Sequence, residues 1–98
     1  MEPTRDEIDA LRGVALLELG TSWCGFCQAA RPLIDRALAA SPARHIQVED
    51  GKGKRLGRSF GVKLWPTLIV LRDGREVARF VRPRDAAELE QALRAAAA

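Results

Sequence analysis

The chain has 98 residues, of which 47% are hydrophobic and 30% charged, an ordinary composition for one globular domain. No apolar run approaches the ~20 residues of a membrane-spanning helix, and the polar residues 1–7 lack a secretory-signal pattern, so we expect a cytoplasmic location. The net charge is +3, but acidic residues are interspersed with basic ones and tyrosine is absent, which argues against a nucleic-acid-binding surface.

A short helix and a buried strand are predicted at the start of the chain. Thr4 and Glu7 have the spacing of a capping box, which predicts a helix that ends by Gly13. Residues 14–20, VALLELG, form an apolar run bounded by glycines, which is typical of a strand covered on both faces. Glu18 is the charged residue inside this run, and burying a carboxylate is unfavourable unless the charge is stabilised or has a function.

A long helix follows, then a second strand. The helical pattern runs from residue 24 to about residue 40, and Pro32 inside it should kink the helix because its ring removes a backbone donor. Residues 45–49, HIQVE, predict a short strand. The glycine-rich segment 51–61 predicts a loop with one weak helix near residues 55–60.

The last part of the chain predicts a hairpin and a closing helix. Two apolar stretches, residues 67–71 and 77–81, flank the turn sequence at residues 72–75. Asp85 and Glu88 have the spacing of caps for a final helix.

This order of elements, α-β-α-β-α-β-β-α, predicts an α/β fold. Strands joined through helices run parallel and the hairpin strands run antiparallel, so we expect one mixed, four-stranded sheet with helices on both faces. No repeat or linker indicates a second domain, and residues 1–98 are expected to form a single one.

Cys24 and Cys27 form a Cys-x-x-Cys pair where the apolar strand gives way to the long helix. At a helix N-terminus, unpaired backbone N–H groups and the positive end of the helix dipole favour the nucleophilic thiolate. A second cysteine three residues later lies within reach of the first. Cys24 would therefore attack a substrate disulfide, and Cys27 would resolve the mixed disulfide.

Two other interpretations of the cysteine pair stay open. Zinc or copper carriage would need more ligands than the two thiols. The sequence offers only one histidine, His45, and scattered carboxylates, so no metal site is predicted. His45 itself is expected to be structural or at the surface. Inert buried cysteines are the other alternative, which the neighbouring Trp23 and Gly25 disfavour.

Residues 23–27, Trp-Cys-Gly-Phe-Cys, resemble the active-site signature of the thioredoxin family, and the likeness extends over nearly the whole chain. Pro32 lies where thioredoxins kink their active-site helix. Residues 60–67, FGVKLWPT, resemble the segment that ends in the family's cis-proline, which would make Pro66 that residue, and residues 72–74 match its late hairpin turn. The resemblance implies a thioredoxin fold that lacks the first strand of full thioredoxins.

The resemblance also implies roles for particular residues. Pro66, if its peptide bond is cis, would present the backbone of Trp65 to an extended substrate; an ordinary trans proline is the alternative. Glu18 falls at the family's buried acid and would take the proton of Cys27; the alternative is a glutamate at an exposed position of the strand. Trp23 is expected to be an exposed contact residue or, alternatively, part of the core.

Four departures from the family pattern bear on specificity. Phe26 replaces a proline between the cysteines. Because the two residues between the cysteines tune the reduction potential, that of this dithiol could lie anywhere between roughly −270 and −120 mV. Gln47 replaces a lysine, and without that cation we expect Glu18 to stay neutral over a wider pH range. Trp65 replaces a smaller residue, and Arg82 replaces a glycine of the substrate groove, which indicates an acidic or anionic partner.

We therefore expect a thiol–disulfide oxidoreductase that works as a reductant in electron transport and cell redox homeostasis. Its substrates would be protein or small-molecule disulfides, and a reductase or partner dithiol would supply the electrons. We expect a monomer without a cofactor, nucleic acid or membrane partner. The alternative is a module of the same fold that binds partners or senses redox state without general reductase activity.

Overall fold

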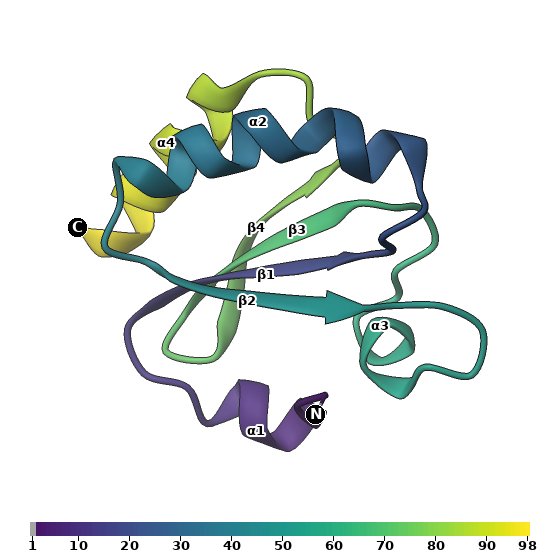
Figure 1. Ribbon diagram of the computed structural model, residues 1–98. Coiled ribbons are helices and arrows are strands. Elements are labelled where there is room, and N and C mark those ends of the chain that lie inside the picture. The colour runs from purple at the N-terminus through teal and green to yellow at the C-terminus, as the bar shows by residue number, and fades with distance from the viewer. Residues whose placement is uncertain (1) are drawn as a thin grey trace.

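A mixed four-stranded sheet forms the centre of the computed structural model, which describes residues 2–98, so that only Met1 of the expected domain lies outside it (Figure 1). The strand order is β2-β1-β3-β4. The strands are β1 (Val14–Gly20), β2 (Arg44–Glu49), β3 (Thr67–Arg72) and β4 (Arg75–Val81). Strand β1 pairs parallel with β2 and antiparallel with β3, and β3 pairs antiparallel with β4. The predicted mixed sheet is confirmed.

Two helices cover each face of the sheet: α2 and α4 lie over one face, and α1 and α3 lie over the other (Figure 1). The helices are α1 (Arg5–Asp9), α2 (Gly25–Ala39), α3 (Arg55–Ser59) and α4 (Ala86–Ala97). Helix α2 begins one residue later than predicted because Cys24 is its N-cap, and it continues through Pro32 to its end. The capping box between Thr4 and Glu7 is present at α1.

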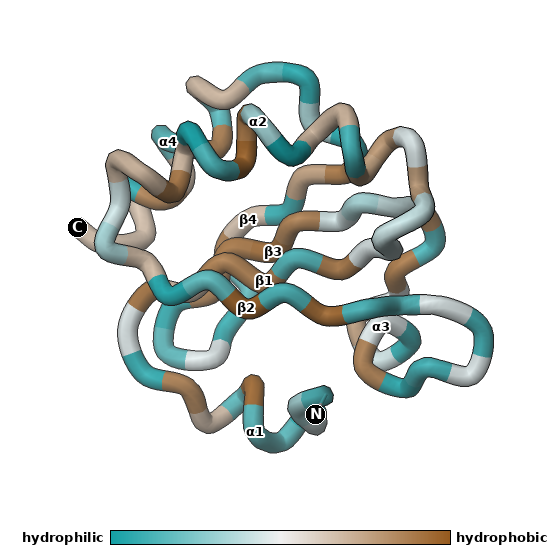
Figure 2. The backbone as a smooth tube through the Cα atoms, viewed as in Figure 1, coloured by the Kyte–Doolittle hydropathy of each residue, from teal (hydrophilic) through white to brown (hydrophobic). Residues whose placement is uncertain are grey.

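The core lies on both faces of strands β1 and β3. The five interior residues of β1 are all buried, as are the first five residues of β3. Figure 2 shows hydrophobic residues concentrated where these strands cross the middle of the sheet. Alternate side chains point to opposite faces. The face under α2 and α4 therefore contains Leu16, Leu68, Val70, Ile34 and Leu89, and the opposite face contains Leu17, Ile69, Ile8, Leu56 and Phe60.

The hairpin turn between β3 and β4 is fastened to the loop that follows α1. Asp73 and Gly74 both have positive φ angles, 52° and 79°. The backbone N–H of Asp73 donates to the carbonyl of Gly13 at 2.9 Å, and the Oδ1 atom of Asp73 accepts from the N–H of Gly13 at 2.8 Å. The Asp9 carbonyl occupies the space where a side chain at Gly74 would lie. The turn thus ties the N-terminal segment to the sheet.

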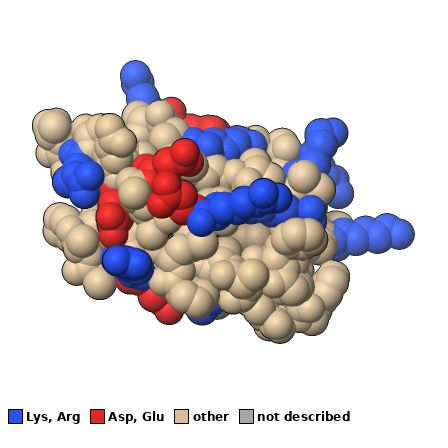
Figure 3. Space-filling model, turned by 90° about the horizontal axis from the view of Figure 1, so that it is seen from above, with Lys and Arg blue, Asp and Glu red and all other residues tan. Residues whose placement is uncertain are grey.

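Charged side chains of both signs gather on the face formed by α2 and α4 (Figure 3). On α2, Arg31 pairs with Asp35 at 3.0 Å, one helical turn away. None of the helices within residues 2–98 has the length and apolar character needed to cross a membrane.

Candidate active site

The two cysteines lie where β1 has ended and α2 begins. Cys24 is the N-cap residue of α2, and its Sγ atom accepts a hydrogen bond from the backbone N–H of Cys27 at 3.4 Å. Both residues are free thiols and mostly buried, with 7% of Cys24 and 8% of Cys27 exposed. Cys24 therefore has the helix N-terminal position that the sequence predicts.

The pKa values of the two thiols are shifted in opposite directions. The pKa of Cys24 is lowered, mainly by the side-chain hydrogen bond with Cys27, and backbone N–H groups of the first turn and the charge of Arg82 lower it further. Burial raises the pKa of Cys27 to about 11. Cys24 is therefore the thiol that ionises first, while Cys27 keeps its proton at neutral pH. This difference suits a nucleophile and a resolving cysteine.

Alkylation by iodoacetamide is expected to select Cys24. Because the reactive fraction is the thiolate, lowering the pH should leave Cys24 reactive below the ~8.5 at which an ordinary cysteine is half ionised. Cys27 should react only as the pH approaches its raised pKa of about 11. Brief labelling across a pH series, followed by peptide mass spectrometry, measures both profiles. A Cys24 profile centred at or above that of glutathione, measured alongside, would contradict the lowered pKa.

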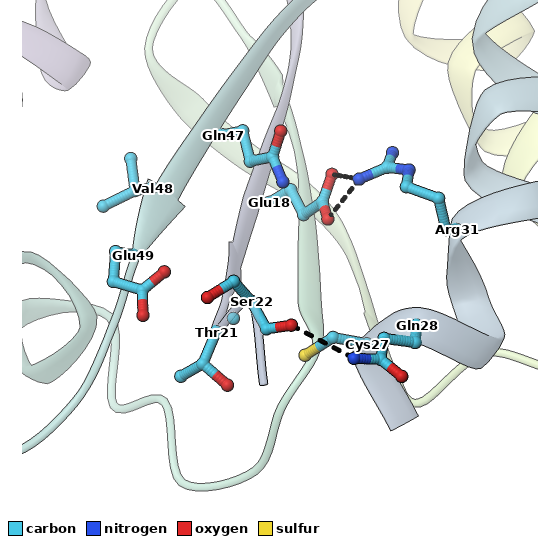
Figure 4. A pocket seen from close by; sticks show the side chains of 10 residues that line it. Glu18, Thr21, Ser22, Cys27, Gln28, Arg31, Gln47, Val48 and Glu49 are labelled. Atoms are coloured by element: carbon cyan, nitrogen blue, oxygen red, sulfur yellow. Dashed lines mark hydrogen bonds and ion pairs between the residues drawn. The ribbon is translucent and has the colours of Figure 1, made fainter. Parts of the chain in front are cut away.

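Glu18 is buried in the pocket that also contains Cys27. The side chain of Glu18 is 4% exposed. A cavity of about 270 Å³ lies between β1, β2 and the first turns of α2, and Glu18, Cys27 and Arg31 are among its lining residues (Figure 4). The charge of Glu18 contributes to the raised pKa of Cys27. The predicted burial of Glu18 is confirmed, and this carboxylate is electrostatically coupled to the resolving thiol.

The expectation that Glu18 lacks a cation is wrong. Gln47 does lie opposite Glu18 in the register of β1 and β2, but α2 supplies the charge: Arg31 Nη1 is 2.9 and 3.1 Å from the two carboxylate oxygens (Figure 4). His45 also reaches the site, with its Nε2 atom 2.8 Å from Oε1 of Glu18. The four-residue spacing of Cys27 and Arg31, which places both on one face of α2, is the signal that could have found this cation.

The Trp65–Pro66 peptide bond is cis, as the sequence predicts. The carbonyl oxygen of Trp65 lies 3.9 Å from Cys24 Sγ and accepts a hydrogen bond from Arg82 Nε at 2.9 Å. The backbone N–H of Arg82 donates to the carbonyl of Pro66 at 2.9 Å. The Arg82 guanidinium lies 3.7 Å from the centroid of the Phe26 ring. Three predicted substrate-binding residues and Phe26 therefore meet beside Cys24.

Two tryptophans next to the dithiol, Trp23 in the sequence and Trp65 in the structure, are in contact with each other. The rings of Trp23 and Trp65 meet edge to face with centroids 5.7 Å apart. Trp65 Nε1 donates to Oδ2 of the buried Asp50 at 2.9 Å, which fixes the indole; sequence reasoning did not single out this acid. Trp23 is 69% exposed and Phe26 is 56% exposed, so Trp23 is not part of the core.

Metal-ligand clusters are absent from the described part of the chain. No three or more His, Cys, Asp or Glu side chains within residues 2–98 are grouped so that they could hold a metal ion. Metal carriage would therefore rest on the thiols of Cys24 and Cys27 alone.

The sequence matches the thioredoxin family model over residues 4–95. The chain belongs to the thioredoxin family. Thioredoxin of Chlamydia muridarum is 32% identical over 74 residues, which cover 74% of this chain and 72% of that protein. The structure of reduced thioredoxin 2 from Pseudomonas aeruginosa matches with a TM-score of 0.85 and 57% identity, covering 98% of this chain and 90% of that chain. A point mutant of thioredoxin from Halobacterium salinarum shares the fold at a TM-score of 0.81, with 24% identity and coverage of 95% and 82%.

This thioredoxin-family protein is a thiol–disulfide oxidoreductase with a Cys-x-x-Cys dithiol. Family membership implies protein disulfides as targets and a reductase as electron donor. Two of its departures from the family pattern are in contact with each other, because the Arg82 guanidinium lies over the Phe26 ring. The sequence indicated each departure separately and gave no sign that they form one unit beside the dithiol.

Proposed function

We propose that Cys24 is the nucleophile and Cys27 the resolving cysteine of a disulfide reductase. The Cys24 thiolate attacks a substrate disulfide, which releases one substrate thiolate and forms a mixed disulfide. Cys27 then attacks Cys24 Sγ, releasing the second thiolate and leaving a Cys24–Cys27 disulfide. A reductase or partner dithiol returns the two electrons. The observation that carries this proposal is the position of Cys24 Sγ at the N-cap of α2, where it accepts the Cys27 N–H, and the lowered pKa of Cys24 beside the raised pKa of Cys27 agrees with it.

Glu18 is the proposed acceptor of the Cys27 proton. With a pKa of about 11, Cys27 has little thiolate at neutral pH, so its attack needs a base. Glu18 lines the same pocket and is coupled to Cys27 through its charge. The carboxylate is buried, and Arg31 holds it in place.

Trp23, Trp65, Pro66 and Arg82 are the proposed substrate-binding residues. An extended substrate would pair with the backbone of Trp65 beside Cys24, in the manner of an added strand. The exposed Trp23 ring would contact its side chains, and Gly25, between the two cysteines, has open space where a side chain would lie. The Trp65 carbonyl has two lone pairs, so it could accept from a substrate N–H while Arg82 Nε still donates to it. The remaining N–H groups of the Arg82 guanidinium would then suit an acidic side chain of the substrate.

Trapping tests this function. Cys27→Ser is expected to accumulate mixed disulfides through Cys24, because the first attack proceeds and the resolving step is lost. Cys24→Ser is the matched control and should trap no client. Both full-length variants are recovered from cells after thiols are blocked, and the adducts are identified on non-reducing gels and by mass spectrometry. Equal adduct levels in the two variants would replace the proposed function with that of a binding or redox-sensing module.

We also propose that the protein acts in the cytoplasm, without a bound cofactor. A catalytic dithiol that must be returned to its free-thiol form suits a reducing compartment such as the cytoplasm. The dithiol supplies both electrons, so no bound cofactor is required. We further propose that residues 1–98 act as one domain and as a monomer, and that the protein also reduces small-molecule disulfides. The mixed charges over α2 and α4 are not proposed to bind nucleic acid (Figure 3).

A further inference from the structure

His45 joins the buried Glu18 to the protein surface. The side chain of His45 is 29% exposed, against 4% for Glu18, and 2.8 Å separates its Nε2 atom from Glu18 Oε1. In the register of the sheet, His45 lies opposite Leu16, and Gln47 lies opposite Glu18. His45 is therefore two residues before the direct partner of Glu18, on the same face of the sheet, and its ring reaches the carboxylate diagonally.

The two groups that hydrogen-bond the carboxylate differ in chemistry. Arg31 stays protonated, so it can fix Glu18 and balance its charge but cannot accept a proton from it. His45 carries an imidazole, whose ring nitrogens can accept a proton on one side and donate one on the other. The charged and titratable groups around Glu18 are Cys27 and Arg31 from α2, with Asp35 behind Arg31, and His45 and Glu49 from β2. Among these, His45 is the titratable group in hydrogen-bond contact with Glu18.

We propose that His45 relays to solvent the proton that Glu18 takes from Cys27. The relay rests on the proposed role of Glu18. As Cys27 Sγ attacks Cys24 Sγ, its proton passes to the Glu18 carboxylate, and the substrate leaves as a thiolate with the bonding electron pair. Glu18 Oε1 passes the proton to Nε2 of neutral His45. The imidazolium loses a proton to water through its exposed ring, and Glu18 is again ionised.

His45 acts through Glu18 rather than on the sulfur atoms, so it is a positioning residue for proton transfer. A merely structural histidine would stabilise the fold without setting the rate of a proton-transfer step. The resolving step must therefore be isolated from substrate binding and from the first attack.

The probe for this step is the mixed disulfide of Cys24 with thionitrobenzoate. Reduced full-length protein is mixed with the aromatic disulfide of that thiol, and release of the second thionitrobenzoate is followed by stopped-flow absorbance across a pH series. This phase is first order and reports attack by Cys27. His45→Gln keeps an amide donor for Glu18 but cannot titrate. It is expected to slow the phase about tenfold at neutral pH. This is the lower end of the effect seen when a residue that hydrogen-bonds a metal ligand is replaced.

Chemical rescue separates proton transfer from structure. In His45→Ala, added imidazole is expected to restore the rate of this phase, whereas it should leave the unmodified protein unchanged. Gln47→Ala is the matched control, since this residue lies on the same strand and lines the same cavity. It should release the second thionitrobenzoate at the rate of the unmodified protein. Thermal unfolding of each variant confirms that it is folded.

The two proposals fail in different ways. Glu18→Gln is expected to slow resolution roughly 100-fold, as loss of a general base does, and adding His45→Gln to it should slow the phase no further. An unslowed Glu18→Gln would remove Glu18 as the base and the relay with it. Three results would overturn the relay alone. The first is a resolving phase that is slow in Glu18→Gln but unchanged in His45→Gln. The others are a slower phase in the double variant than in Glu18→Gln, and a rate in His45→Ala that imidazole does not restore.

Discussion

Replacing Cys24 with serine is expected to lower the rate of insulin-disulfide reduction on the order of 10³-fold or more, because a serine hydroxyl is not ionised at neutral pH. Cys27 cannot take over the attack. The pKa of Cys27 is raised to about 11, whereas that of Cys24 is lowered, so Cys27 has much less thiolate than Cys24 at neutral pH. The measurement is the turnover of insulin reduction by the full chain with a dithiol donor in excess.

Ser22→Ala provides the control for this prediction. Ser22 is exposed and close in sequence, and only its backbone carbonyl accepts a hydrogen bond, from Gln28 at 3.2 Å. This variant should reduce insulin at the rate of the unmodified protein. Equal turnover in Cys24→Ser and the unmodified protein would remove Cys24 from the nucleophile role.

Gly74→Ala is expected to be the most damaging of the glycine substitutions for stability. A non-glycine residue at φ 79° costs about 1–2 kcal/mol. The new methyl group would also overlap the backbone carbonyl of Asp9, which cannot rotate away as a side chain does. Together we expect a loss of at least about 3 kcal/mol, within the range for strained and overpacked sites. The melting temperature should fall by more than roughly 10 °C.

Gly13→Ala separates the two contributions to that loss. Gly13 has the same φ of 79°, but apart from its chain neighbours no atom of residues 2–98 lies within 4 Å of where its Cβ would be. It should therefore lose only the backbone contribution, about 1–2 kcal/mol. Thermal unfolding of the reduced proteins, followed by circular dichroism, compares the pair. Equal losses would show that the Asp9 carbonyl moves aside at no cost.

The fold could be predicted because each element has its own local pattern. The apolar run at residues 14–20 predicted both ends of β1 correctly, because a glycine marks each end of the run. A strand that is covered on both faces needs no alternation of apolar and polar residues. The start of α2 was misplaced by one residue, because a helical pattern does not distinguish the N-cap from the first helical residue. Strand β2 likewise begins one residue early, at Arg44.

The site was only partly predictable, and the limit is physical. The dithiol lies within four residues, so its spacing and its place before a helix indicated its chemistry. The environment of Glu18 comes from other elements: Arg31 is 13 residues away along the chain and His45 is 27 away. The resemblance places the family's cation at Gln47, where this chain has none, whereas the cation beside Glu18 is Arg31 of α2. The Phe26–Arg82 contact also depends on tertiary placement.

The sulfur of Cys24 is both an electron donor and the cap of α2, since it accepts the N–H of Cys27. A thiolate accepts this hydrogen bond more strongly than a neutral sulfur in a disulfide, so oxidation weakens the cap of the helix. The order of the first turn and the redox equilibrium are therefore thermodynamically linked. A cap is worth about 1 kcal/mol, which corresponds to roughly 20 mV for a two-electron couple. The stability of the first turn of α2 is thus a component of the reduction potential.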